Sequence, residues 1–99
     1  MTISKTSENN NTVLAITGKL DSNTSKELSK EIEPVLAEAC DITLDFTALQ
    51  TISSAGLRVL LSTHKSCKAG GKTMIIKGAN PSVQEVFDLM GFTGLFTII

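Results

Sequence analysis

The spacing of the apolar residues alternates along this chain between the period of a β-strand and that of an α-helix, and this constrains the fold more than any other feature. Strand-like and helix-like runs follow one another, so helices should cover a sheet whose later strands are parallel and joined by right-handed crossovers. The expected strands are Thr2–Ser7, Thr12–Gly18, Asp41–Phe46 and Lys72–Lys77, and the expected helices begin near Thr24, Ser54 and Pro81.

This order predicts an α/β fold with a mixed four- to five-stranded sheet, an N-terminal hairpin and three covering helices, in the sequence β-β-α-β-α-β-α-β. The apolar stretch Phe92–Ile99 is expected either to return as an edge strand or to pack as a tail, since its periodicity fits both. Residues 1–99 together form a single domain in this interpretation.

Local signals place the start and course of the first helix. Thr24-Ser25-Lys26-Glu27 has the form of a capping box, in which Thr24 and Glu27 satisfy each other's backbone donors. Pro34 cannot donate to the carbonyl four residues earlier, so a kink or local break is expected between Lys30 and Pro34. The predicted buried stripe consists of Leu28, Ile32, Val35, Leu36 and Ala39.

Composition argues against several classes of function. Nine basic and ten acidic residues give a net charge of -1 without a basic stripe, and the chain has no Trp or Tyr, so nucleic-acid binding is not expected. Cys40 and Cys67 form no CxxC pair and there is one His, so no metal, redox centre or cofactor is expected. The sequence lacks a signal-peptide start and a run of membrane-spanning length, which predicts a cytoplasmic protein without membrane insertion.

The segment from Leu44 to Arg58 is the main candidate for a functional site, because it runs from a strand through a loop into a helix. Small residues from Ser53 to Gly56 leave the first helical turn open, and the backbone donors of that turn have no partners within the helix. A partner or an anion can therefore approach closely. Ser54 is the candidate N-cap, and a simple capping role is the alternative interpretation.

The same segment resembles a known family. Asp45-Phe46-Thr47, five residues, and then Ser53-Ser54-Ala55-Gly56-Leu57-Arg58 is similar to the signature of STAS-domain anti-sigma factor antagonists. The resemblance covers nearly the whole chain, and it predicts a STAS-like fold. Its other parts are the hairpin, Gly18–Asp21 before the first helix, Gly70–Lys72 before the fourth strand, and Asn80–Gly91 as the third helix.

The resemblance implies a partner-switching role without catalysis. In that family the unphosphorylated domain binds an anti-sigma factor that is also a serine protein kinase, which releases a sigma factor. Phosphorylation by the kinase ends the binding, and a serine phosphatase restores it. The matching acceptor in this chain is Ser54, with Ser53 as the alternative. Ser53 stands where many antagonists carry Asp, and Ala55 stands where a second small polar residue is common.

A phosphoserine at a helix N-terminus gains about 0.3–1 kcal/mol from the helix dipole, so the modification should disturb binding and leave the fold intact. The expected docking surface is the open start of the second helix together with the loop before the first helix. Its members are Asp21, Ser22, Asn23, Ser53, Ser54, Ala55, Gly56 and Arg58, with Leu57 and Leu61 included if they point outward.

Two other functions remain open. The chain could be a scaffold subunit that docks on another protein, such as a transporter ATPase, without phosphorylation. An enzyme is disfavoured, because Ile52 replaces the first glycine of a Gly-x-Ser-x-Gly elbow and His64 lies about 15 Å along the helix from Ser54. Gly71-Lys72-Thr73 ends like a phosphate-binding loop, but it leads from a helix into a strand.

Overall fold

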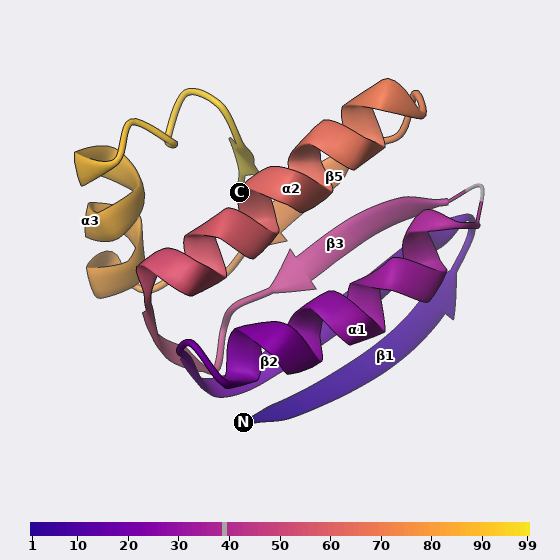
Figure 1. Cartoon of the computed structure of the whole chain (residues 1–99). Coiled ribbons are helices and arrows are strands. Elements are labelled where there is room, and N and C mark those ends of the chain that lie inside the picture. The colour runs from indigo at the N-terminus through magenta and orange to yellow at the C-terminus, as the bar shows by residue number, and fades with distance from the viewer. Residues whose placement is uncertain (39) are drawn as a thin grey trace.

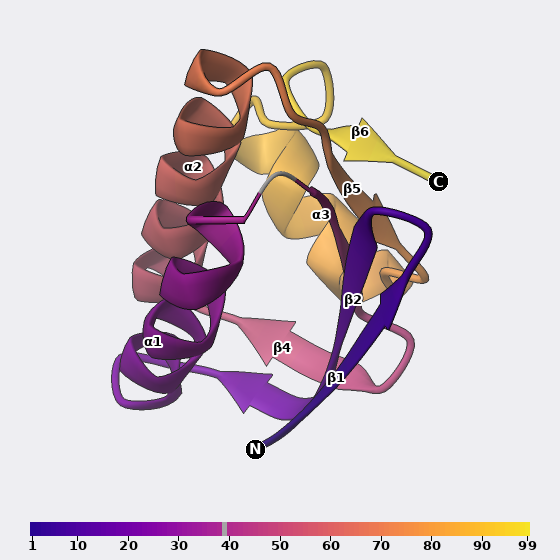
Figure 2. The same cartoon turned by 90° about the vertical axis from the view of Figure 1, so that its right-hand side faces the viewer.

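The computed structural model describes residues 1–38 and 40–99 of the protein. Figure 1 shows that α1 and α2 cover one face of the sheet, and Figure 2 shows these two helices side by side. α3 packs against β4. The strands are β1 (Thr2–Glu8), β2 (Asn11–Leu20), β3 (Asp41–Asp45), β4 (Leu49–Ile52), β5 (Met74–Lys77) and β6 (Thr97–Ile98), and the helices are α1 (Thr24–Leu36), α2 (Ser54–Ala69) and α3 (Pro81–Leu89).

The sheet is mixed, with the order β1-β2-β3-β5-β6. β1 and β2 are antiparallel, and the tight turn between them places Asn9 and Asn10 at φ values of 48° and 61°. Asn tolerates this left-handed region better than most residues, and two such residues in succession suit a hairpin turn. The remaining pairs are parallel, as the crossovers through α1, α2 and α3 require.

β2 changes partners along its length. Its first half pairs with β3, and after an irregularity between Gly18 and Lys19 its last residues pair with β4. Gly18 has a φ of +100°, which is accessible to glycine at little cost. The bend directs the end of β2 and the whole of β4 toward the starts of α1 and α2.

The core lies between the sheet and the helices. Alternate residues of β2 are buried on the side that faces the helices, as the period of a strand requires. Each large apolar side chain removed from water contributes about 1.5–3 kcal/mol. The core includes Leu14, Ile16 and Leu20 of β2, Leu28, Ile32 and Val35 of α1, Leu44 of β3, Leu57 and Leu60 of α2, and Ile76 of β5.

The predicted fold class is confirmed, and the structure adds one strand to it. Leu49–Ile52, expected to be an apolar loop, forms β4, which is too short for its periodicity to be recognised. Both expectations for the C-terminal stretch hold in part, since Phe96 packs in the core and Thr97–Ile98 pair with β5. Asn80 caps α3 by accepting the Val83 N–H at 2.9 Å.

The prediction for the start of α1 is wrong. Thr24 is the first helical residue, and Asp21 provides the cap in place of a Thr24–Glu27 box. α1 continues through Pro34 without a break and ends at Leu36. Of the predicted stripe, Ala39 lies outside the described residues. None of the helices in the described part of the chain is long and apolar enough to span a membrane.

Candidate functional site

The chain enters α2 through a serine that the fold holds firmly. Ser53 is extended, with φ −97° and ψ 173°, and its N–H donates to the Leu20 carbonyl oxygen at 2.8 Å. Its side-chain oxygen accepts the Gly56 N–H at 3.4 Å. Ser53 is therefore the N-cap of α2, which corrects the prediction that Ser54 occupies this position.

Ser54 is the first residue of α2, and its side chain is exposed. At this position the backbone N–H groups of the first turn have no partners within the helix. Because Ser53 supplies the cap, the Ser54 hydroxyl is not needed for it. The two adjacent hydroxyls thus differ in environment. Ser53 is half-buried and its hydroxyl caps the helix, whereas Ser54 faces solvent at the positive end of the helix dipole.

Gly56 allows α2 to begin in close contact with the sheet. A Cβ atom at this buried position would lie 2.9 Å from Cγ1 of Ile52 and 2.9 Å from both Cγ and Cδ2 of Leu20. These atoms come from the ends of β4 and β2, so the small residue sets the distance between helix and strands. The open space that the sequence predicts around Gly56 is occupied by the side chains of Ile52 and Leu20. Gly56 is buried and is not part of the accessible surface.

The predicted docking residues along α2 divide into two groups. Leu57 is 4% exposed and packs in the core, so it does not point outward and its inclusion in the docking surface is wrong. Leu61 is half-buried and packs against the same core. Arg58 is exposed and Ala55 is half-exposed, and these two side chains remain on the open face.

The loop before α1 is exposed and rigidly bonded. Oδ1 of Asp21 accepts the N–H groups of Asn23 at 3.0 Å and Thr24 at 2.9 Å. The hydrogen bonds from Thr24 are the main cause that lowers the pKa of Asp21. The hydroxyl of Ser25 is buried and bonds to the Asp21 carbonyl oxygen. Asp21, Ser22 and Asn23 are all exposed beside the site.

A groove between the starts of α1 and α2 brings several of these residues together. It encloses about 260 Å³, and its lining includes Ser22, Ala55 and Arg58 from the predicted surface. Its walls are completed by residues that were not predicted, namely Ser25, Lys26, Ser29 and Val59. Their spacing of three and four residues on each helix is the sequence signal that could have revealed a shared face.

The Asp-x-Thr element of the signature shapes the loop that leads to α2. Oδ1 of Asp45 accepts the Thr47 N–H at 3.0 Å and the Thr47 hydroxyl at 2.6 Å. The Thr47 hydroxyl bond is the main cause that lowers the pKa of Asp45. Gly78, with φ +75°, lies directly against Thr47. These hydrogen bonds fix the conformation of the loop that follows β3 and leads toward the site.

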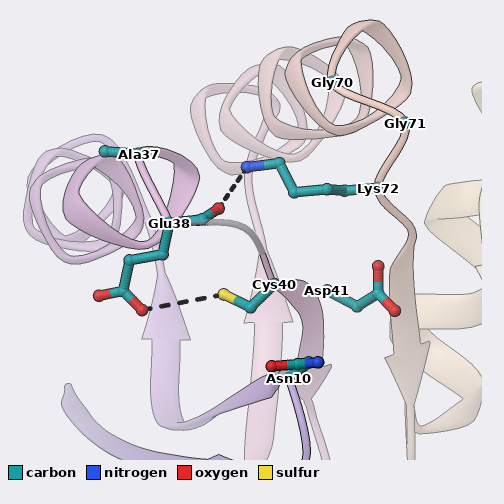
Figure 3. Close-up of a pocket in the computed structure, with 8 residues that line it drawn as sticks. All are labelled: Asn10, Ala37, Glu38, Cys40, Asp41, Gly70, Gly71 and Lys72. Atoms are coloured by element: carbon teal, nitrogen blue, oxygen red, sulfur yellow. Dashed lines mark hydrogen bonds between the residues drawn. The ribbon is translucent and has the colours of Figure 1, made fainter.

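A separate pocket lies at the opposite ends of α1 and α2, and Figure 3 shows its lining. Nζ of Lys72 donates to the carbonyl oxygens of Leu36 at 2.6 Å and Glu38 at 2.7 Å. Both carbonyls lie at or beyond the end of α1, where a cation is favoured. Lys72 therefore fastens the end of α1 to the start of the segment that leads into β5.

The sole histidine has a structural environment. The His64 ring packs edge-on against Phe96, with 5.5 Å between ring centroids. Within residues 1–38 and 40–99, no group of three or more His, Cys, Asp or Glu side chains is arranged to hold a metal ion. The chemistry of the site thus centres on the exposed Ser54 hydroxyl, the start of α2 and the basic side chains of Lys26 and Arg58.

Comparison with known proteins gives the family. Residues 2–99 match the sequence model described as STAS domain. The chain belongs to the STAS domain family. It is 30% identical over 89 residues to an anti-sigma F factor antagonist of Paenibacillus polymyxa, covering 88% of this chain and 74% of that protein. It is 33% identical over 75 residues to the putative anti-sigma factor antagonist BtrV of Bordetella bronchiseptica, covering 71% of this chain and 65% of that protein.

Solved structures confirm the STAS fold. The structure of the anti-sigma factor antagonist SpoIIAA in its unphosphorylated form aligns with a TM-score of 0.86 at 19% identity, over 99% of this chain and 88% of that one. The phosphorylated form of the Bacillus protein SpoIIAA aligns with a TM-score of 0.78 at 17% identity, over 99% and 91%. Both forms of that protein therefore share the architecture of this STAS domain.

Proposed function

We propose that this STAS domain is an anti-sigma factor antagonist, and that phosphorylation of Ser54 switches its partner binding off. The observation that carries the proposal is the pair of serines at the start of α2. Ser53 is half-buried and caps the helix, whereas Ser54 is exposed on the first turn. A kinase can reach the Ser54 hydroxyl without opening the fold. Two relatives, 33% and 30% identical to this chain, are named as a putative anti-sigma factor antagonist and an anti-sigma F factor antagonist.

The unphosphorylated form binds an anti-sigma factor that is also a serine kinase, and so releases a sigma factor. Transfer of phosphate to Ser54 adds about -1.5 to -2 charges to the contact surface. A charge buried in an interface without a partner costs several kcal/mol, which is enough to separate the two proteins. A serine phosphatase that removes the phosphate returns the domain to its binding form.

The switch acts on the interface and not on the fold. Phosphate at the N-terminus of α2 is favoured by the helix dipole by about 0.3–1 kcal/mol, so the helix start is retained. The Ser54 side chain is exposed, whereas Leu57, about one turn further along the helix, is buried in the core. That SpoIIAA keeps the same fold in its unphosphorylated and phosphorylated forms supports this view.

The test uses serine kinases of the anti-sigma type encoded in the same genome, incubated with this protein and ATP. Intact mass should show one added phosphate, and peptide mapping should place it on Ser54. Ser54→Ala should accept none and bind the kinase constitutively, and Ser54→Asp should not bind. Ser53→Ala is the matched control and should still be phosphorylated.

Two results would contradict the proposal. A Ser54→Asp protein that binds the kinase as tightly as the wild type would remove the switch. Failure of every such kinase to add phosphate would instead favour the alternative of a scaffold subunit that docks permanently on another protein.

A further inference from the structure

The groove between the starts of α1 and α2 has a distinct charge. Two of its side chains are bases, Lys26 from α1 and Arg58 from α2, and the others are small hydroxyl or aliphatic groups. Both bases are exposed. The N-termini of the two helices lie at the same end, as Figure 2 shows, and the dipole of α2 adds to the positive potential there. This end of the groove is suited to anionic groups.

One acidic side chain beside this region, Asp21, is bonded to the start of α1. Oδ1 of Asp21 accepts the N–H groups of Asn23 and Thr24 at the start of α1. It therefore compensates the helix start to which it is bonded, and it is not among the side chains that line the groove. The basic character of the groove is retained beside it.

The groove continues along the two helices and becomes less basic. A second hollow of about 260 Å³ shares Ser29, Arg58 and Val59 with the first and extends to Leu36 and Glu33. An extended or helical segment laid in the groove would meet positive charge at the Ser54 end, an aliphatic floor at Val59, and negative charge at Glu33. This sequence of charges is complementary to a segment that begins with acidic residues.

We infer that the α1–α2 groove binds an acidic segment of the partner, with Arg58 and Lys26 as its charged contacts, and that phosphate on Ser54 ends this binding by pairing with Arg58. The inference rests on the proposed function and names the partner surface that it requires. Guanidinium groups bind carboxylate and phosphate through the same planar fork, so Arg58 can exchange one for the other.

The spacing of the two residues supports this exchange. Ser54 and Arg58 are four residues apart on α2, and residues at this spacing lie on the same helical face about 5–6 Å apart at Cβ. A phosphate on Ser54 is within reach of the long Arg58 side chain. Phosphorylation then both adds negative charge beside the groove and removes one of its two bases from the partner.

The binding test compares charge reversals at matched positions, measured as dissociation constants for the kinase that the phosphorylation assay identifies. Arg58→Glu and Lys26→Glu should each weaken binding about tenfold or more, and raising the salt concentration should weaken wild-type binding more than theirs. Lys65→Glu is the control, since Lys65 is exposed on the same helix and the net charge changes equally. It should bind like the wild type.

A second measurement tests the pairing without a partner. In ³¹P NMR titrations of the Ser54-phosphorylated protein, Arg58→Gln should raise the apparent pKa of the phosphate, because the paired guanidinium favours the dianion, and Lys65→Gln should leave it unchanged. An unchanged pKa in Arg58→Gln overturns the pairing.

The outcomes separate the inference from the function on which it rests. If Ser54→Asp abolishes binding and both groove reversals bind like the wild type, the groove assignment is overturned and the switch stands. If the reversals and Lys65→Glu weaken binding equally, the effect is one of net charge and the groove assignment is again overturned. If Ser54→Asp binds normally, the proposed function fails whatever the groove variants do.

Discussion

Replacing Gly78 by Ala should destabilise the protein strongly, because two separate costs coincide there. Gly78 has φ +75°, and this left-handed conformation costs an L-residue about 1–2 kcal/mol. A Cβ atom would also lie 3.1 Å from the backbone N of Thr47 and 3.2 Å from its Cα. Backbone atoms cannot turn aside as a side chain can, and overpacking of this kind costs about 1–3 kcal/mol. The expected total is about 3 kcal/mol.

Gly71→Ala provides the matched control. Gly71 has φ +71° but no atom within 4 Å of the added Cβ, so it should bear only the conformational cost of about 1–2 kcal/mol. The assays are urea denaturation and thermal unfolding, both followed by far-UV circular dichroism, since the chain has no Trp or Tyr to report by fluorescence. In a domain of this size the Gly78 variant should melt roughly 12–24 °C below the wild type. Equal losses in the two variants would refute the role assigned to the Thr47 contact.

Three further predictions concern residues around the site and at the opposite end of the helices. Ser53→Ala should lower the free energy of unfolding by about 1 kcal/mol or less, because its capping hydrogen bond is long. Ser54→Ala should change the free energy of unfolding by less than about 0.5 kcal/mol. Equal effects of the two variants in denaturation would contradict the assignment of the cap. Hydrogen bonds from Thr47 hold the pKa of Asp45 below its ordinary value of 3.8, so the stability that Asp45 contributes is present above that pH and is lost as the pH falls through the lowered pKa. Asp45→Asn should therefore flatten the acid side of the profile of unfolding free energy against pH, and a profile parallel to that of the wild type would argue against the bond. Lys72→Met should lower the free energy of unfolding by about 1–2 kcal/mol, because the hydrogen bonds to the end of α1 are lost. It should not slow phosphorylation of Ser54. Denaturation and a kinase assay check the two expectations, and unchanged stability would be inconsistent with those bonds.

The sequence predicted the elements with strong periodicity and missed the short ones. β2 and α2 have enough residues for their periods to be distinguished, and both lie where their patterns indicate. β4 has four residues and pairs only with the end of β2, so its existence depends on the bend at Gly18. A contact between residues 18–20 and 49–52 cannot be inferred from either segment alone.

The sequence identifies the start of α2 as the candidate site, but the roles of the residues within it depend on three-dimensional contacts. Capping propensity alone does not distinguish Ser53 from Ser54; the bond from Ser53 N–H to Leu20 does, because it fixes Ser53 in the extended conformation of an N-cap. Similarly, Thr24 has the sequence of a cap, and Asp21 takes the role because the loop turns its carboxylate onto the helix start. Both corrections arise from tertiary structure overriding a local preference.

The central claim is that phosphate on Ser54 prevents binding without altering the fold beneath it. The most direct test prepares the protein with phosphoserine at position 54 and measures both its affinity for the partner kinase and its free energy of unfolding. The affinity should fall about a hundredfold or more, and the unfolding free energy should change by less than about 1 kcal/mol. Unchanged affinity, or a loss of affinity that is accompanied by unfolding, would contradict the account.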